Sequence, residues 1–168
     1  MKKIILLAAL LLPMFAQTLA GGNVPKSKIT SFIYDCQRYE GVEVVQLGGL
    51  ATMALRASLR VAASDDPEVR EMMKLITGVK RISVLNYEQC APDIQDKISR
   101  KLNRMLDGSD LLIETRDGNE LMQIYGVVDD QNGTVRDFVM HTPSEASLIC
   151  IFGSIPIDKL ARVIADND

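Results

Sequence analysis

The sequence predicts an α+β fold: a single domain whose mixed sheet ends in a C-terminal four-strand antiparallel meander, with helices packed mainly on one face. Two observations predict it. Up to Asp107-Gly108, stretches with the apolar period of helices alternate with short apolar runs typical of strands. After these residues, four strand-like runs follow one another, separated by turn residues. The 168 residues contain no repeat or linker, which indicates one domain.

The N-terminus has the three parts of a secretory signal peptide. Lys2 and Lys3 give a positive start, residues 4–12 are apolar, and Ala20 ends a small-residue cleavage motif. The apolar run is shorter than the about 20 residues that span a bilayer. We therefore expect cleavage after Ala20 and a periplasmic or secreted protein, with no transmembrane segment after cleavage. Retention of the apolar segment as an anchor stays open as the alternative.

The rest of the chain divides into a flexible leader at residues 21–27 and one α+β domain at residues 28–168. The net charge is −3, and signal cleavage would remove two lysines and make it more negative. A nucleic-acid partner needs a clustered basic surface, so we expect none here. Trp is absent and aromatic residues make up 5% of the chain, which disfavours a base-stacking surface.

The first predicted elements follow from local patterns. Apolar residues from Ile29 to Cys36 recur at i, i+3, i+4 and i+7, which predicts a helix. Residues 42–47 are apolar on both faces, as in a central strand. After Gly48-Gly49, residues 50–62 carry two apolar stripes, which predicts a largely buried helix.

The middle of the chain predicts helix, strand and helix. Asp66-Pro67 can cap and begin a helix that ends at Gly78. Residues 79–87 form a strand with Leu85 and Tyr87 on one face. Pro92 begins a helix with one apolar side and one charged side, and the charged side is typical of a solvated face.

The C-terminal part predicts a meander and a final helix. Asp-Gly and Asn-Gly pairs tolerate the positive φ of tight hairpin turns. We expect a last helix to start at Ser154 and to pack its apolar side inward. Because helical crossovers separate the two earlier strands, we expect those strands to be parallel or mixed with the rest. The four meander strands are predicted at residues 111–115, 120–128, 134–141 and 146–152.

The chain contains three cysteines, Cys36, Cys90 and Cys150. The odd count leaves at least one thiol unpaired, and the sequence leaves open whether any two form a disulfide. Cys36 and Cys150 lie in apolar stretches and are interpreted as small buried hydrophobic residues. Cys90 just precedes a predicted helix, whose N-terminus would lower the thiol pKa, so it is the candidate for a reactive thiol.

His141 is the one histidine of the chain, and we interpret it as a surface or strand-end residue. The alternative is that it serves as the base for Cys90 in a catalytic pair, which would need the two side chains to meet in space. A lone histidine without C-x-x-C or H-E-x-x-H motifs predicts no metal site.

Gly48-Gly49 lies between a predicted strand and a predicted helix, where a phosphate-binding loop would be expected. The third glycine of the dinucleotide motif and the lysine of the ATP motif are both missing. We therefore expect no cofactor, and we interpret the two glycines as a backbone bend.

Four segments are informative when taken in order: residues 40–45, 79–85, 110–113 and 148–155. In this order they resemble the small exported proteins of Bacteroidetes grouped as domain of unknown function 4252. The resemblance implies an α+β envelope protein and carries no catalytic residue with it. Some members have a lipid-acceptor cysteine after the signal peptide, and no cysteine stands at that place here.

The leading hypothesis is an exported envelope protein that acts as a non-catalytic protein-interaction or structural module, through a protein partner or as a homo-oligomer. One alternative is a thiol-dependent enzyme or redox protein that uses Cys90 with His141. Another is a binder of small apolar ligands, which would need a roomy apolar pocket between sheet and helices.

Overall fold

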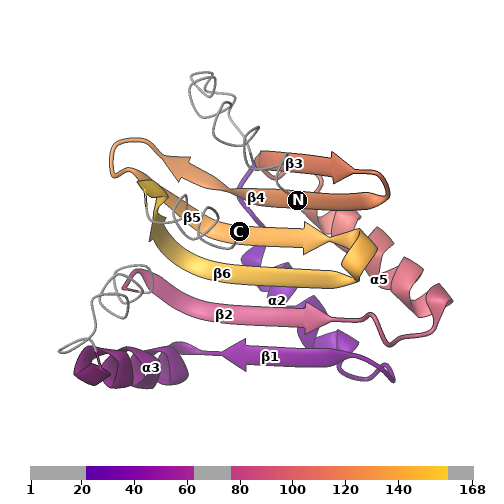
Figure 1. The fold of residues 1–168 in the computed structure, drawn as a ribbon, viewed down its shortest axis with the longest axis horizontal. Coiled ribbons are helices and arrows are strands. Elements are labelled where there is room, and N and C mark those ends of the chain that lie inside the picture. Colours follow the sequence, from indigo (N-terminus) through magenta and orange to yellow (C-terminus); the bar gives the residue numbers. More distant parts are fainter. Residues whose placement is uncertain (1–21, 63–76, 159–168) are drawn as a thin grey trace.

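The structure is a computed structural model that describes residues 22–62 and 77–158. Three α-helices, six strands and one 3₁₀ turn follow one another in this part of the chain (Figure 1). In chain order they are α2 (Lys26–Cys36), β1 (Glu43–Leu47), α3 (Gly49–Ala62), β2 (Val79–Asn86), α5 (Pro92–Leu106), β3 (Leu111–Asp117), β4 (Glu120–Asp129), β5 (Thr134–Thr142), η2 (Pro143–Glu145) and β6 (Ser147–Pro156).

The six strands form one sheet in the order β1-β2-β6-β5-β4-β3, which confirms the single α+β domain with its C-terminal meander. Every ladder between neighbouring strands is antiparallel. The expected parallel or mixed pairing of the two early strands is therefore wrong. Parallel neighbours need a crossover packed over the sheet, whereas α3 lies beyond the end of β1 (Figure 1).

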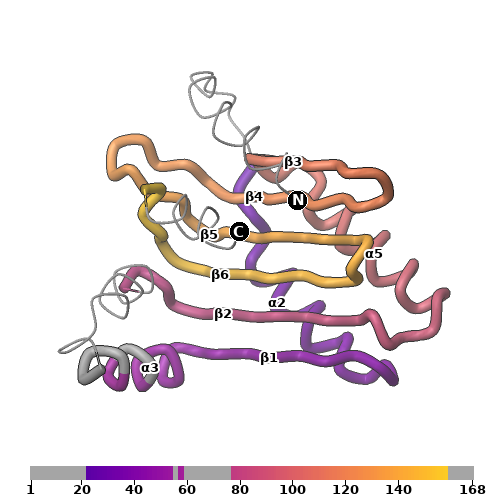
Figure 2. Tube along the Cα trace, viewed as in Figure 1, coloured from indigo at the N-terminus to yellow at the C-terminus, as the bar shows by residue number. Residues whose placement is uncertain are grey.

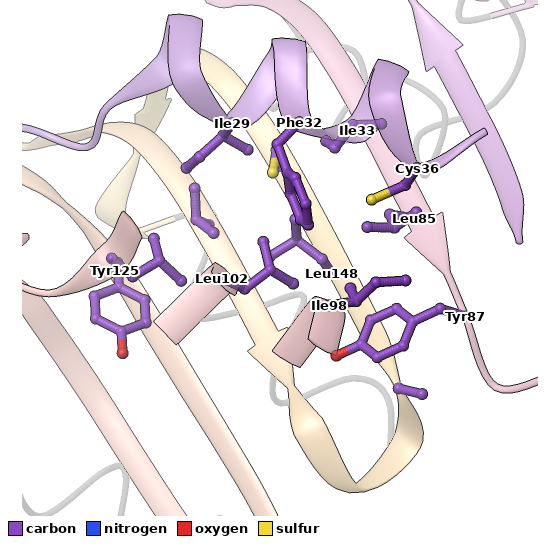
Figure 3. Close-up of a cluster of buried hydrophobic side chains, with 14 of the residues drawn as sticks. Ile29, Phe32, Ile33, Cys36, Leu85, Tyr87, Ile98, Leu102, Tyr125 and Leu148 are labelled. Atoms are coloured by element: carbon purple, nitrogen blue, oxygen red, sulfur yellow. The ribbon is translucent and has the colours of Figure 1, made fainter. Parts of the chain in front are cut away.

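One face of the sheet packs against α2 and α5, as the sequence predicted (Figure 3). The apolar side of each helix is buried there, and alternate residues of the strands meet it. In the register of the sheet, Leu85 of β2 stands opposite Leu148 of β6, and both are fully buried. Other members of this cluster are Ile29, Phe32, Ile33, Cys36, Tyr87, Ile98, Leu102, Tyr125, Val139 and Cys150.

The opposite face carries a second apolar cluster made by the other residues of the same strands. Its buried members are Val79, Ile124, Phe138 and Ile155. Half-buried residues that pack against this cluster extend it across the sheet from β2 to β3. They are Ile82, Leu112, Ile113, Met122, Met140 and Ile151.

Two predictions for the β1–α3 segment are wrong. β1 is an edge strand, because β6 inserts between β2 and β5 and takes the central position (Figure 2). The side chains that the structure describes in α3 are mostly exposed: Leu50 is 84% exposed and Met53 is 62% exposed. Thr52 is buried and donates its hydroxyl to the carbonyl of Gly49 at 3.0 Å. Apolar sequence alone does not ensure burial, because much of any protein surface is apolar.

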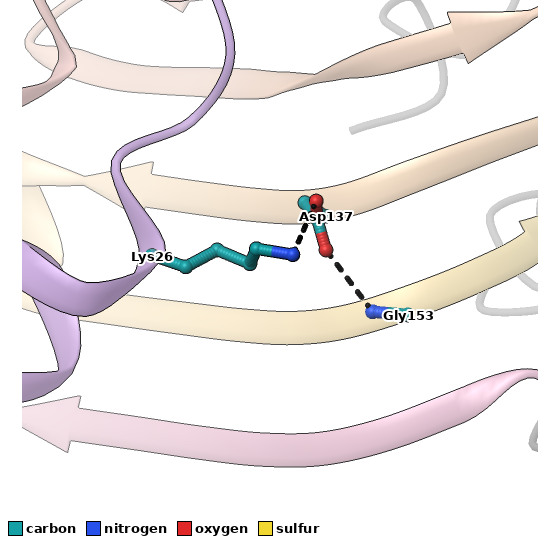
Figure 4. Close-up of polar contacts among 3 residues, drawn as sticks. All are labelled: Lys26, Asp137 and Gly153. Carbon is teal, nitrogen blue, oxygen red and sulfur yellow. Dashed lines mark hydrogen bonds and ion pairs between the residues drawn. The ribbon is translucent and has the colours of Figure 1, made fainter.

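Residues 22–25, expected to be part of a flexible leader, lie against the domain. Val24 is buried in the cluster beneath the helices, and Gly22 bridges to Ser109. At the start of α2, Lys26 Nζ pairs with Asp137 Oδ2 at 3.0 Å (Figure 4). The Gly153 N–H donates to the other carboxylate oxygen of Asp137 at 3.2 Å, so one side chain ties α2 to β5 and β6.

At the C-terminal end, the helix predicted from Ser154 is wrong at its start. β6 continues to Pro156, because Ser154 pairs with Arg136 and Ile155 pairs with Val135. The predicted hairpin glycines are confirmed, with φ of 58° at Gly118 and 59° at Gly133. The signal peptide, the helix predicted from Asp66 and the rest of the final helix lie outside the described residues.

Candidate functional site

The structure places His141 in the interior of the protein. It stands near the end of β5, opposite Leu148 of β6, and its side chain is fully buried. The strand-end prediction is confirmed and the surface prediction is wrong. The alternation of side chains along β5 could have predicted this burial. His141 points to the same face as Val139, which lies in the helix-covered cluster.

His141 belongs to a short chain of hydrogen bonds with Tyr87 and Ser99. The Tyr87 hydroxyl lies 3.2 Å from His141 Nε2 and 2.9 Å from the Ser99 hydroxyl. His141 Nδ1 makes no hydrogen bond within the described part of the chain. A buried acceptor without a partner is tolerated better than a buried donor, which favours the tautomer protonated at Nε2.

Burial lowers the pKa of His141 to about 4, so the imidazole is neutral at pH 7. Burial also raises the pKa of Tyr87, against the opposing effect of its hydrogen bond with Ser99. These hydrogen bonds connect α5 and β5 through Tyr87, which directly follows β2. Tyr87 and His141 are fully buried and Ser99 is half-buried.

The structure also buries all three cysteines and holds them as free thiols. Burial raises the pKa of Cys90, which is opposite to the lowering expected from the following helix N-terminus. Burial likewise raises the pKa of Cys36 to about 11 and that of Cys150 to about 12. The structure thus confirms the interpretation of Cys36 and Cys150 as small buried hydrophobic residues.

No hydrogen bond joins His141 to a cysteine sulfur within the described residues, because its Nε2 meets Tyr87 and its Nδ1 has no partner. The two residues proposed for a catalytic pair therefore do not form one in this arrangement. In residues 22–62 and 77–158, no group of three His, Cys, Asp or Glu side chains is placed to hold a metal ion.

Two surface hollows are open to solvent. The first, of about 560 Å³, is lined by Tyr39, Glu40, Gly41, Gln89, Ala91 and Ile94. Lys97 and Arg38 each lie 5.3 Å from the centre of the Tyr39 ring and hold the pKa of that hydroxyl below its usual range. The second hollow, of about 550 Å³, lies beside Tyr125 and the end of α5.

Exposed apolar side chains concentrate on β1 and the first turns of α3. Among the described residues, six large apolar side chains are exposed, and three of them lie between residues 45 and 53. These are Val45, Leu50 and Met53, which we name the β1–α3 surface. Sequence reasoning missed this surface, because the same apolar residues suggested a central strand and a buried helix.

Residues 37–163 match a family described as a domain of unknown function, DUF4252. The match covers most of the chain. The chain belongs to the DUF4252 family. No curated protein and no solved structure gives a significant match to it.

The DUF4252 region begins directly after α2 and includes every strand of the sheet. It therefore contains the hydrogen bonds among Tyr87, Ser99 and His141, and the β1–α3 surface. No helix in the described part of this DUF4252 chain is long and apolar enough to cross a membrane.

Proposed function

We propose that this DUF4252 protein is an exported envelope protein that acts as a non-catalytic protein-interaction module. The observation that carries the proposal is the β1–α3 surface, where Val45, Leu50 and Met53 are 55%, 84% and 62% exposed. Exposed apolar side chains are typical of protein-binding sites where they form a contiguous patch. Val45 lies in the edge strand β1, and Leu50 and Met53 lie in α3, which follows directly.

Export is supported by the N-terminal sequence. Lys2 and Lys3 precede the apolar run of residues 4–12, and small residues at Thr18 and Ala20 suit signal cleavage. After cleavage at Ala20, the folded domain would begin within a few residues of the new N-terminus, since Gly22 already bridges to Ser109.

A thiol-dependent activity at Cys90 has no observation in its favour. The thiol is buried and its pKa is raised, whereas nucleophilic cysteines need a stabilised thiolate. A small-ligand binder would need an enclosed apolar pocket, and the hollows beside Tyr39 and beside Tyr125 are open to solvent.

The proposal is tested by photo-crosslinking in living cells. A photoreactive phenylalanine analogue at Leu50 should form an adduct with a protein, either another copy or a different chain, recovered from the envelope fraction. Tyr34 on α2 is the matched control, because it is 69% exposed and lies outside the β1–α3 surface. The analogue at Tyr34 should give no such adduct. Equal labelling at the two positions, or no adduct at Leu50, would contradict the proposal.

A further inference from the structure

We infer that two copies of this chain pair through β1, antiparallel and centred on Val45, so that their sheets join into one continuous sheet. The inference rests on the proposed function, because it names a second copy of the chain as the protein that the β1–α3 surface binds. Three features support it: a sheet edge with few guards among the described residues, the distribution of charge along that edge, and the exposed side chains beside it.

Within the described residues, the outer side of β1 carries few of the usual edge guards. An edge strand presents a row of backbone N–H and C=O groups, which proteins usually guard with a short strand, charged side chains, proline, a bulge or a covering segment. β1 is short and carries one charge, at Glu43, but it contains neither lysine nor proline, and its ladder with β2 runs without a register shift. Within the described residues, no strand pairs with its outer side. Val45 at its centre is 55% exposed.

The other edge of the sheet, β3, carries several of these guards. Its ladder with β4 has a register shift between Leu111 and Ile113. The N-terminal segment covers its beginning, since the Asp110 N–H donates to the Gly22 carbonyl at 3.2 Å. Exposed charges at Arg116 and Asp117 occupy its other end. Because β3 carries more guards than β1, we expect the free edge of β1 to be the one that pairs.

Pairing β1 with β1 gives a closed dimer. A contact between β1 of one copy and β3 of the next is heterologous, and such contacts build rings where the rotation closes and open-ended filaments where it does not. A twofold pairing uses the same edge of both copies and stops at two. With the twofold axis normal to the sheet, α2 and α5 of both copies lie on the same side.

The charge along β1 suits an antiparallel pairing centred on Val45. Glu43 then stands opposite the partner's Leu47, and Val44 opposite the partner's Gln46, so the two Glu43 carboxylates lie at opposite ends. A parallel pairing in register would place Glu43 beside Glu43, and like charges directly opposite are destabilising. The antiparallel register also brings Leu50 next to the segment that precedes the partner's β1, where its exposed side chain would be covered.

The first test is sedimentation equilibrium of the purified protein, processed as in the cell, over a range of concentrations. The wild type should behave as a dimer that dissociates on dilution. Val45→Lys places a charge on the pairing edge and should abolish the dimer. Val128→Lys is the matched control, because Val128 is also exposed, at 41%, but lies in β4 away from the edge. A wild type that remains monomeric at all concentrations would overturn the inference.

Disulfide trapping tests the register and does not depend on how Val45→Lys folds. Directly opposite residues of antiparallel strands lie about 4.5–5.5 Å apart at Cα, which is within the range of a disulfide. Two copies of Val45→Cys should therefore cross-link when copper phenanthroline passes two electrons from the paired thiols to dioxygen. The natural cysteines are buried and should not react. Glu43→Cys alone should not cross-link, because its partner position is Leu47. Equal cross-linking of both variants would overturn the register.

The sedimentation and cell experiments separate this inference from the proposed function. If the protein is monomeric and its Leu50 adduct in cells contains a different chain, the β1 dimer is refuted. The proposed function as an interaction module is then still supported. A monomeric protein without any adduct at Leu50 refutes both.

Discussion

Alternate residues of the same strands build both faces of the sheet, yet the side chains on the helix-covered face are buried more completely. Beneath α2 and α5, fully buried apolar residues surround polar groups such as His141 and Ser83. The cluster on the opposite face consists of aliphatic, phenylalanine and methionine side chains. The neighbours Leu148 and Ile149 show the contrast, since Leu148 is fully buried and Ile149 half-buried. Close packing and pH sensitivity should therefore belong to the helix-covered face.

The largest expected effect is the loss of packing beneath the helices. Leu148→Ala should lower the free energy of unfolding by about 2–5 kcal/mol, because it leaves a cavity among fully buried side chains. Ile149→Ala removes a side chain of equal size from the opposite face and should cost clearly less, since that residue keeps part of its exposure. Urea unfolding monitored by circular dichroism measures both. Equal losses would show that the two faces are packed equally tightly.

The second effect is a dependence of stability on pH that arises from His141. Its pKa is about 4 in the folded protein and about 6.5 when unfolded, so the unfolded chain binds more protons between these values. Stability therefore falls as pH decreases, by about 2 kcal/mol between pH 7 and pH 5.

His141→Gln is the matched variant, because it can still reach the Tyr87 hydroxyl and does not titrate. The chain has one histidine, so this change should remove most of the slope between pH 7 and pH 5. Unfolding measured at both pH values for the two proteins provides the check. A slope that survives the substitution would place the titrating groups elsewhere.

Much of the fold could be predicted because its elements follow local periodicity. The apolar stripes of α2 and α5 and the alternation in β2 identified the side chains that meet beneath the helices. The position of β1 could not be read in this way. Whether a short apolar strand is central or at an edge depends on where β6, more than 90 residues later, inserts into the sheet.

The candidate surface was missed for a related reason. Leu50 and Met53 have the composition of a core helix, and their exposure follows from the position of α3 beyond the end of β1 (Figure 1). His141 was predicted at a strand end, but its hydrogen bond joins residues 54 positions apart. Local patterns carry no information about such a contact.

The smallest effect concerns the charged contact at the margin of the helix-covered face (Figure 4). Lys26 is 54% exposed, so its ion pair with Asp137 should contribute about 0–1 kcal/mol. Lys26→Met and Asp137→Asn should each cost this amount, and the double variant should cost no more than either single change. Asp137→Ala should cost more, about 1–2 kcal/mol, because it also removes the acceptor for the Gly153 N–H.

Asp137 has a further role, because its φ of 57° lies in a region that aspartate and asparagine tolerate better than alanine. Denaturant unfolding of the four variants separates the ion pair from the combined loss of the acceptor and of the tolerated backbone conformation. If Lys26→Met costs as much as Asp137→Ala, the ion pair itself holds α2 on the sheet. If it costs little, the apolar side of α2 fixes the helix in place, and the charged pair only closes the edge of that face.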